Sequence, residues 1–414
     1  MSVVLVKPNE KRKQYGRVVH LSAIEPPIWL VLFAQKFPGA KIVDMEAEGL
    51  DGAGLLVRLK ELAAERVVVL AIGSHPSAHI QQTEAAENLR NLIVTALRLP
   101  VDVYNHLVFN PVEMAPPDWS LVPVKSYRAH NWHSWGRKDK SYGAVFSSIS
   151  CPFSCEFCCV KDFYRSDYTQ REPRLLLDDV RGLVDKGITN FKMMDELFAI
   201  NNKGVHAVLE LLKASGLGSE INIWAYARID TVDAALLKKL RSAGILWLAY
   251  GIESGDENIR KDIMKGRFDN AKIRDVIRMT KDAGIHIIGN YMFGFWDDNL
   301  DTMRATFDLS RELLCEYSNF YCVTAYPGSQ LYEDMKSRGI DMPQTGEEFS
   351  QMSPRFKPVP TKHLSGLDVL RFRDNAFNEY YSDGKYLSFM GSKFGSVVVD
   401  EIQDMLKVKI REKV

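Results

Sequence analysis

The sequence predicts an α/β protein: a doubly wound N-terminal domain, a partial (β/α)6 barrel and a small helical C-terminal region. Short apolar runs alternate with amphipathic segments in the first part of the chain, and the alternation resumes from Ser141. This pattern is typical of parallel strands joined by helical crossovers. A proline-rich stretch separates the two series. We expect domains at 1–110 and 141–332, a linker at 111–140 and the helical region at 333–414.

The N-terminal domain is expected to hold one four-stranded sheet. Apolar runs predict strands at 3–6, 41–45, 67–72 and 101–104. Amphipathic periodicity predicts helices at 23–37, 53–64 and 82–99. Pro26 and Pro27 fall in the first turn of the first helix, where a missing N–H costs little.

The second series predicts six strands on one barrel, whose carboxyl ends share a face. We place strands at 144–149, 190–194, 221–225, 246–250, 285–293 and 319–324. The helices between them fall at 174–186, 203–215, 234–243, 270–283 and 300–312. Gly187, Gly244 and Gly284 follow three of these helices as expected stops. Beyond the barrel, residues 343–365 look irregular, and helices are expected at 366–381 and 397–409.

Charge and hydropathy disfavour a nucleic-acid-binding protein and a membrane-spanning protein. The 414 residues include 53 basic and 53 acidic side chains, so the formal net charge is zero. That balance disfavours a nucleic-acid partner. The apolar runs at 3–6 and 28–34 are too short for a signal-peptide core or a membrane span. We expect a cytoplasmic protein without a membrane span.

The most informative motif is a cysteine loop after the first barrel strand. Cys151, Cys155 and Cys158 have C-x3-C-x2-C spacing. Thiolates are the usual ligands of iron–sulfur clusters, and three of them leave one iron of a cubane open. The alternative is a structural zinc site, but such sites usually show a second cysteine pair or histidines at defined spacing. We therefore expect a [4Fe–4S] cluster, with Cys159 packed beside it rather than ligating.

This spacing in a six-unit βα barrel resembles the radical S-adenosylmethionine superfamily over about residues 141–330. The resemblance implies that the open iron binds the amino and carboxylate groups of S-adenosylmethionine. An external one-electron reductant would then drive formation of a 5′-deoxyadenosyl radical. Phe157 matches the aromatic position beside the adenine, and Glu196 matches the glutamate of the family's Gly-Gly-Glu. Helix capping by carboxylates is the alternative role at the latter position.

Polar residues at other strand ends extend the expected cofactor site. Arg228 can grip a carboxylate with two parallel hydrogen bonds, and the resemblance assigns that carboxylate to S-adenosylmethionine. An internal pair with Asp230 or Glu253 is the alternative. Glu253 and Ser254 are expected near the ribose, and Asn290 lies on the strand that resembles the adenine side.

The N-terminal domain resembles the cobalamin-binding subfamily, which includes methyltransferases and the anaerobic cyclase of chlorophyll synthesis. The matching stretches are 24–27, 44–49 and 73–77, and we expect His75 and Ser77 to contact cobalamin. Such sheets bind ligands beyond their carboxyl ends, here at loops 8–22, 45–52 and 73–80. The D-x-H-x-x-G motif is absent and the domain looks short of a fifth strand.

The linker concentrates aromatic residues in the segment 127–136, which includes His130, Trp132, His133 and Trp135. Two interpretations stay open. The segment either walls a cavity between the two cofactors or packs as an ordinary interface, at which tryptophan is common.

These observations predict a radical enzyme that methylates an unactivated carbon of a small-molecule substrate with cobalamin. The alternatives are a radical cyclase, epimerase or other rearrangement, with or without cobalamin. A non-catalytic iron–sulfur or zinc module is the hypothesis from another class. No catalytic residue is assigned from the sequence.

Overall fold

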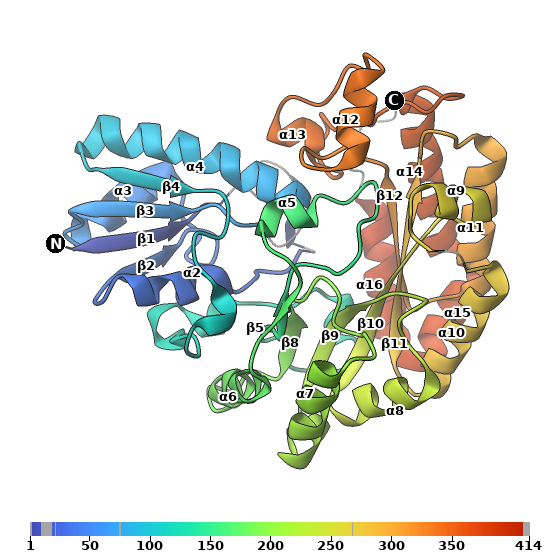
Figure 1. Ribbon diagram of the computed structural model, residues 1–414, viewed down its shortest axis with the longest axis horizontal. Helices are drawn as coiled ribbons and strands as arrows, with labels where there is room; N and C mark the ends of the chain where they lie inside the picture. The colour runs from blue at the N-terminus through green and yellow to red at the C-terminus, as the bar shows by residue number, and fades with distance from the viewer. Residues whose placement is uncertain (1, 10–18, 21, 74–75, 267, 409–414) are drawn as a thin grey trace.

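The computed structural model describes residues 2–9, 19–20, 22–73, 76–266 and 268–408. Figure 1 shows a smaller N-terminal lobe beside a larger lobe that holds the barrel and the C-terminal helices. His75 lies outside the described residues.

The first sheet is parallel with strand order β2-β1-β3-β4. Its strands are β1 (Val3–Lys7), β2 (Lys41–Asp44), β3 (Arg66–Leu70) and β4 (Val101–Tyr104). Its helices are α2 (Ile28–Phe33), α3 (Gly52–Glu61) and α4 (Pro76–Leu97). The predicted doubly wound sheet is confirmed.

The helix predicted at 23–37 is too long, because α2 spans only Ile28–Phe33. Pro27 is the N-cap of α2, and Ala34–Lys36 continues as a 3-10 turn. The residues before Pro27 are extended, and the N–H of Ile24 donates to the carbonyl of Arg128, 2.9 Å away. Proline restricts the residue before it to extended backbone, so the helix starts only after the second proline.

The second sheet is the predicted partial barrel, parallel with strand order β12-β11-β10-β9-β8-β5. Its strands are β5 (Gly143–Val145), β8 (Asn190–Met193), β9 (Asn222–Ala227), β10 (Ile245–Glu253), β11 (His286–Phe293) and β12 (Tyr317–Cys322). The connecting helices are α6 (Pro173–Val184), α7 (Lys203–Ala214), α8 (Ala234–Ser242), α10 (Asn270–Asp282) and α11 (Leu300–Leu313), with the short α9 (Glu257–Asp262). Gly187, Gly244 and Gly284 have φ of 82°, 88° and 75°, which confirms their role as helix stops.

The strand predicted at 144–149 divides in two. After β5, β6 (Ser148–Ile149) pairs antiparallel with β7 (Thr169–Gln170). The buried carboxylate of Asp195 holds the bend: Ser147 donates its N–H at 2.8 Å and its hydroxyl at 2.6 Å. Ser148 donates its hydroxyl to the same carboxylate at 2.6 Å. This bend directs the following cysteine loop, which ends at α5 (Val160–Tyr164).

The C-terminal region has more helices than the sequence predicted. It contains α14 (Gly366–Ser382), α15 (Gly384–Phe394) and α16 (Ser396–Lys407), and α12 (Gln330–Ser337) and α13 (Gly346–Phe349) precede them. Asp383 is both the C-cap of α14 and the N-cap of α15, so α15 occupies most of the stretch between the two predicted helices. Tyr380 and Tyr381 donate to the carbonyls of Cys315 and Ser318, at 2.9 and 2.7 Å, and fix α14 to the last barrel strand.

The linker folds into 3-10 turns and closes the amino-terminal end of the barrel. The ring of Trp132 lies 5.7 Å from Trp224, 5.4 Å from Trp247 and 5.7 Å from Tyr317. These partners occupy the first halves of β9, β10 and β12. His133 is buried and its carbonyl accepts a hydrogen bond from Asn222 at 2.9 Å. The aromatic segment is therefore the floor of the barrel.

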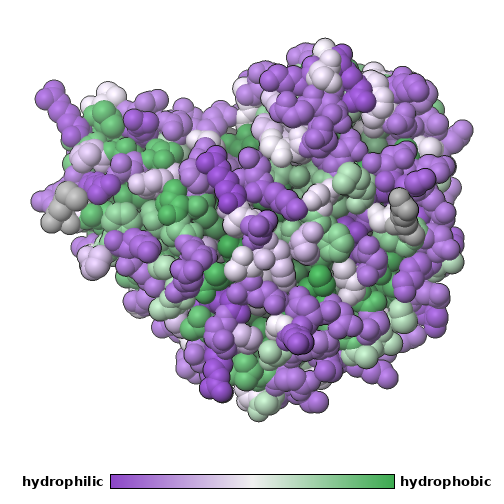
Figure 2. Space-filling model, in the orientation of Figure 1, coloured by the Kyte–Doolittle hydropathy of each residue, from purple (hydrophilic) through white to green (hydrophobic). Residues whose placement is uncertain are grey.

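No helix in the described residues is long and apolar enough to cross a membrane. The face drawn in Figure 2 is mostly hydrophilic, with apolar residues in scattered groups. The boundaries at residues 110, 140 and 332 stay predictions.

Candidate functional site

A cavity of about 1100 Å³ lies between the carboxyl ends of the two sheets. The N-terminal sheet contributes Lys7, Glu46, Leu70 and Ile72, which stand at or beyond the ends of its strands. The barrel contributes the cysteine loop and the inward side chains of its strands. One space is thus reached from both sheets, as ligand sites in parallel α/β folds are.

The inward side chains follow the two-residue period of the strands. Alternate residues face the cavity on each strand or just past its end: Lys192, Met194 and Glu196; Trp224, Tyr226 and Arg228; Ala249, Gly251 and Glu253; Ile288, Asn290 and Met292; Tyr317, Asn319 and Tyr321. Trp132 and His130 line the cavity too, so the linker both packs against the barrel and forms part of the cavity wall. That this wall lies between two cofactors stays a prediction.

The three predicted cluster cysteines all line this cavity and are partly buried. The N–H of Cys158 donates to the carbonyl of Cys155 at 3.1 Å, which closes a tight turn within the loop. Burial raises the pKa of the Cys151 and Cys158 thiols above the ordinary value. Cluster binding must therefore displace protons, as metal binding to thiols generally does.

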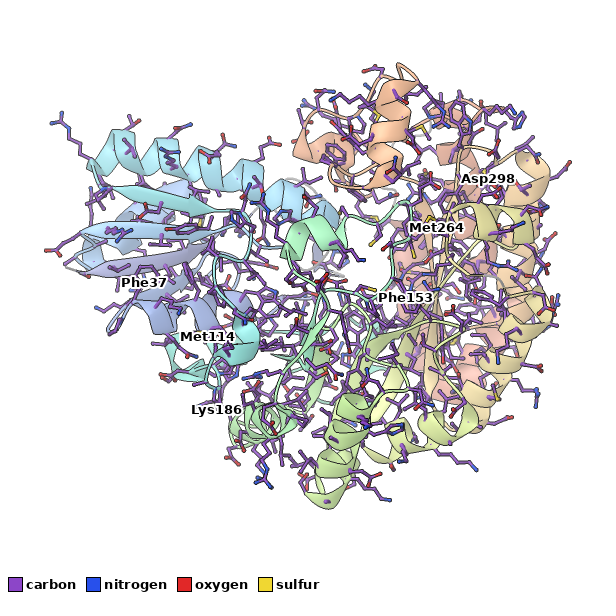
Figure 3. All side chains as sticks on the ribbon, viewed as in Figure 1. Phe37, Met114, Phe153, Lys186, Met264 and Asp298 are labelled. Carbon is purple, nitrogen blue, oxygen red and sulfur yellow. The ribbon has the colours of Figure 1, made fainter. Side chains whose placement is uncertain are left out.

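The surroundings of the cysteines suit an anionic cluster. The Arg228 Nη1 lies 3.4 Å from the sulfur of Cys155, and Lys265 acts electrostatically on the same thiol. Phe153 lies near the middle of the molecule in Figure 3, and its ring centre is 3.8 Å from the Arg228 guanidinium. Two cations beside three thiols offset the negative charge of thiolates and sulfides, so the residues fit a [4Fe–4S] group.

Two further observations concern the metal alternatives. Cys159 is buried and does not line the cavity, as its predicted packing role requires. Within the described part of the chain, no three His, Cys, Asp or Glu side chains are placed to hold a single metal ion. The ligands of a cubane stand farther apart than those of a single metal ion, because each thiolate binds a different iron.

Glu196 lies in the cavity wall and accepts a hydrogen bond from Tyr164 at 3.2 Å. Burial raises the pKa of its carboxyl to about 7, although Lys192 opposes the shift. The helix-capping alternative does not apply, because Asn202 caps α7 and the neighbouring Asp195 binds the serine bend.

Arg228 forms the internal pair that the sequence left open. Its Nε and Nη2 donate to the two carboxylate oxygens of Asp230, each at 2.9 Å, and Nη2 also reaches the carbonyl of Lys265. The remaining edge of the guanidinium faces the cavity and Cys155. Asp230 therefore orients Arg228, and contact with S-adenosylmethionine stays a prediction.

The other predicted contacts divide into those inside and those outside the cavity. Glu253 lines it at a positive φ of 64° and pairs with Lys265 at 2.8 Å. Phe157 and Asn290 also line it. Ser254 does not: it is buried against Thr306, with 3.2 Å between the hydroxyls.

On the N-terminal side, Ser77 lies in the first turn of α4, and its side chain is not among those described. The preceding loop packs closely on that turn. A Cβ at Gly73 would stand 2.2 Å from the backbone nitrogen of His79. Glycine is therefore required where the chain passes from β3 to α4.

Sequence reasoning missed Lys192, Tyr226, Lys265 and Asn319, all of which line the cavity. Lys192 could have been found, because a lysine within the buried run of β8 needs a partner. Its Nζ lies 3.1 Å from the Glu25 carboxylate of the N-terminal domain. Asn319 could have been found by extending the inward alternation from Asn290 to the next strand.

The chain is similar to several known proteins. Residues 145–310 match the Radical SAM superfamily. An uncharacterized methyltransferase of Pyrococcus horikoshii is 24% identical over 304 residues, covering 73% of this chain and 63% of the relative. The anaerobic magnesium-protoporphyrin IX monomethyl ester cyclase of Cereibacter sphaeroides is 24% identical over 232 residues, covering 55% and 36%. The chain thus spans less than two thirds of the length of these relatives.

Two solved structures share the whole architecture. The radical S-adenosylmethionine methyltransferase TsrM from Kitasatospora setae, solved with cobalamin and a [4Fe–4S] cluster, superposes with a TM-score of 0.69 at 14% identity. That match covers 98% of this chain and 99% of TsrM. The cobalamin-dependent S-adenosylmethionine radical enzyme OxsB gives a TM-score of 0.64 at 11% identity and covers 98% of this chain and 71% of OxsB.

The cysteine loop and most of the barrel lie in the segment that matches the superfamily, so residues 145–310 form a Radical SAM domain. Cys151, Cys155 and Cys158 line the cavity, and their role as cluster ligands stays a prediction. The chain has the two-domain fold of the TsrM and OxsB structures.

Proposed function

We propose that this enzyme methylates an unactivated carbon of a small-molecule substrate, using cobalamin together with the cluster and S-adenosylmethionine. The observation that carries the proposal is the single cavity between the carboxyl ends of both sheets, with the cysteines on the barrel side. A methyl donor held by one sheet and a radical source held by the other would then face the same substrate.

The N-terminal side of the cavity suits a corrinoid. Pro8, Leu70 and Ile72 give it an apolar surface. The methyltransferase names of several relatives, such as a bacteriochlorophyllide d C-8(2)-methyltransferase of Chlorobaculum tepidum at 23% identity, support the same reaction class.

The chain's own residues would bind and orient. Cys151, Cys155 and Cys158 would hold the cluster, and Arg228 would bind the carboxylate of S-adenosylmethionine. When bound, these cofactors supply a 5′-deoxyadenosyl radical and a transferable methyl group, with the electron from an external reductant. The apolar and aromatic walls would keep water from the radical.

A cyclase-type outcome is the second candidate, because the Cereibacter sphaeroides relative has that name. The test begins with anaerobic purification, metal analysis and ultraviolet–visible spectra, which measure iron and corrinoid together. Turnover with S-adenosylmethionine and reductant should yield 5′-deoxyadenosine, and the product should be heavier than the substrate by one methyl group. A product without added mass favours the cyclase-type reaction, and protein that takes up no corrinoid contradicts the proposal.

A further inference from the structure

Asn319 and Asn290 form an amide relay on the cavity wall. They are register neighbours on β12 and β11, and Gly251 of β10 continues the same row. The Asn290 Nδ2 donates to the backbone carbonyl of Tyr250 at 3.2 Å, and the Asn319 Nδ2 donates to the Asn290 Oδ1 at 2.9 Å. Both residues are partly buried and line the cavity.

The direction of the relay is fixed at one end by the backbone. A backbone carbonyl only accepts, so Asn290 must present its NH2 to Tyr250 and its oxygen to Asn319. Asn319 must then present its NH2 to Asn290. The Oδ1 atom of Asn319 receives no hydrogen bond from any of the described residues. The chain thus holds one acceptor atom in a set orientation on the cavity wall.

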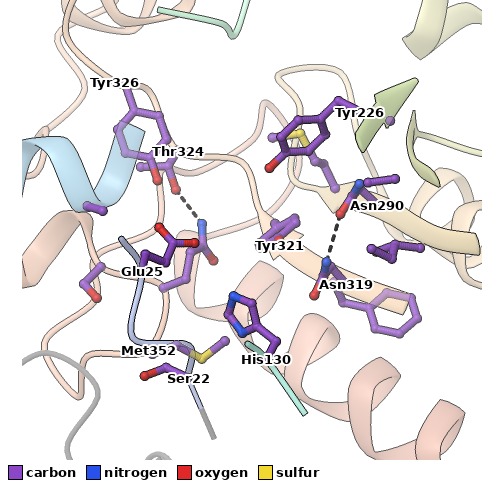
Figure 4. Close-up of a pocket in the computed structure, with 18 of the residues that line it drawn as sticks. Ser22, Glu25, His130, Tyr226, Asn290, Asn319, Tyr321, Thr324, Tyr326 and Met352 are labelled. Carbon is purple, nitrogen blue, oxygen red and sulfur yellow. Dashed lines mark hydrogen bonds between the residues drawn. The ribbon is translucent and has the colours of Figure 1, made fainter. Parts of the chain in front are cut away.

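The opposite wall carries further acceptors. Figure 4 shows Asn319 and Asn290 on one side of the pocket and Glu25 and Ser22 on the other. Glu25 keeps an ion pair with Lys192, so its charge is partly balanced. Burial raises the pKa of Tyr226, and the carboxylates of Glu196 and Glu25, which also line the cavity, add to the shift.

We propose that this part of the cavity binds the substrate through an amine nitrogen, which donates a hydrogen bond to the Asn319 Oδ1 and lies in the field of Glu25. The proposal rests on the proposed function, since it names the substrate class of that site. The Asn319 Oδ1 can only accept, so it can bind an ammonium group, which donates, and cannot bind a carboxylate, whose oxygens only accept. The aromatic rings of Trp224, Tyr226 and Tyr317 offer a surface for the apolar part of the same molecule.

Asn290 is a positioning residue in this scheme. It contacts no substrate, and it prevents the Asn319 amide from turning its NH2 to the cavity. Replacing Asn290 with leucine should therefore weaken amine selectivity although Asn319 is still present.

The test measures binding without turnover. The probes are 2-phenylethylamine, 3-phenylpropionate and 2-phenylethanol, titrated calorimetrically into anaerobic protein that holds its cofactors and lacks reductant. The amine should bind about tenfold tighter than the carboxylate, the size expected of one charge-assisted hydrogen bond. Asn319→Leu should remove most of this difference and Asn290→Leu part of it.

The matched control is Asn88→Leu, the same chemical change at an exposed position of α4 that does not line the cavity. It should keep the selectivity of the unmodified protein. Circular dichroism checks that each variant is folded. Equal binding of the three probes, a preference for the carboxylate, no binding at all, or selectivity that survives Asn319→Leu would each overturn the proposal. Cleavage of S-adenosylmethionine without probe is assayed in parallel, and its absence in unmodified protein would instead count against the proposed function.

Discussion

Lys192 of the barrel and Glu25 of the N-terminal domain form an ion pair inside the cavity, with 3.1 Å between Nζ and Oε1. Their side chains are 5% and 16% exposed, so both charges are largely removed from water. Lys192 also lies over the ring of Trp224, 5.3 Å from its centre. The pair therefore ties the loop before α2 to the inward face of β8.

Glu25→Gln should reduce the free energy of unfolding by about 3 kcal/mol, because it leaves the Lys192 charge buried without its partner. The double variant Glu25→Gln with Lys192→Met should recover much of that loss. Urea unfolding in a double-mutant cycle measures both effects. The control is the exposed pair Arg274 and Glu312, whose removal should cost less than about 1 kcal/mol. A Glu25 effect no larger than the control would contradict this account.

Alanine at Cys151, Cys155 or Cys158 should abolish most iron uptake, because two thiolates cannot hold a cubane firmly. Cys159→Ala should keep the iron, since that side chain is buried away from the cavity. Iron, sulfide and zinc are measured together after anaerobic reconstitution. Zinc in place of iron, or full iron in the Cys155 variant, would refute the ligand assignment.

Arg228→Ala should raise the concentration of S-adenosylmethionine needed for half-maximal cleavage at least about tenfold, because one charge-assisted contact is lost. Arg228→Lys should recover only part of it, since lysine cannot form two parallel hydrogen bonds. The measurement is 5′-deoxyadenosine yield against cofactor concentration, with iron content as the control. If iron falls but the concentration dependence does not change, Arg228 serves only its internal pair with Asp230.

Glu316 gives a pH-dependent contribution to stability. Burial alone would raise the pKa of its carboxyl, but His286 and the Lys393 ammonium lower it to about 2, from an ordinary 4.5. The folded protein thus holds the ionised form more strongly than the unfolded chain does. The contribution is complete above pH 4.5 and is lost as the pH falls toward 2.

Glu316→Gln should therefore cost about 3 kcal/mol of unfolding free energy at pH 7 and much less near pH 2. Denaturant unfolding across that pH range, for the variant and the unmodified protein, measures the difference. A cost that does not change with pH would show that packing, and not the charge, carries the effect.

Strand and helix periods predicted both sheets, because alternation and glycine stops are local signals that tertiary contacts rarely override. The extra C-terminal helix was missed because a single aspartate, Asp383, both ends α14 and begins α15. The shorter first helix was misread because periodicity continues through Pro26 and Pro27 while the backbone does not.

The sequence likewise predicted one part of the candidate site and missed another. Cys151, Cys155 and Cys158 lie close together in the sequence, so their spacing alone predicted that they would share one site, and all three line the cavity. The partners Glu25 and Lys192 are far apart in sequence, and no local pattern joins them. The role proposed for Asn319 depends on its register with Asn290, which only the folded sheet shows. Ser254 falls outside the cavity because it follows the inward-facing Glu253 and packs against Thr306.

Trp132 makes the barrel dependent on the segment that precedes it. A fragment that starts at residue 141 would expose the ring faces of Trp224, Trp247 and Tyr317 to water. A chimaeric protein with a different N-terminal sheet should therefore keep residues 128–136 together with the barrel. Its junction should lie before residue 128.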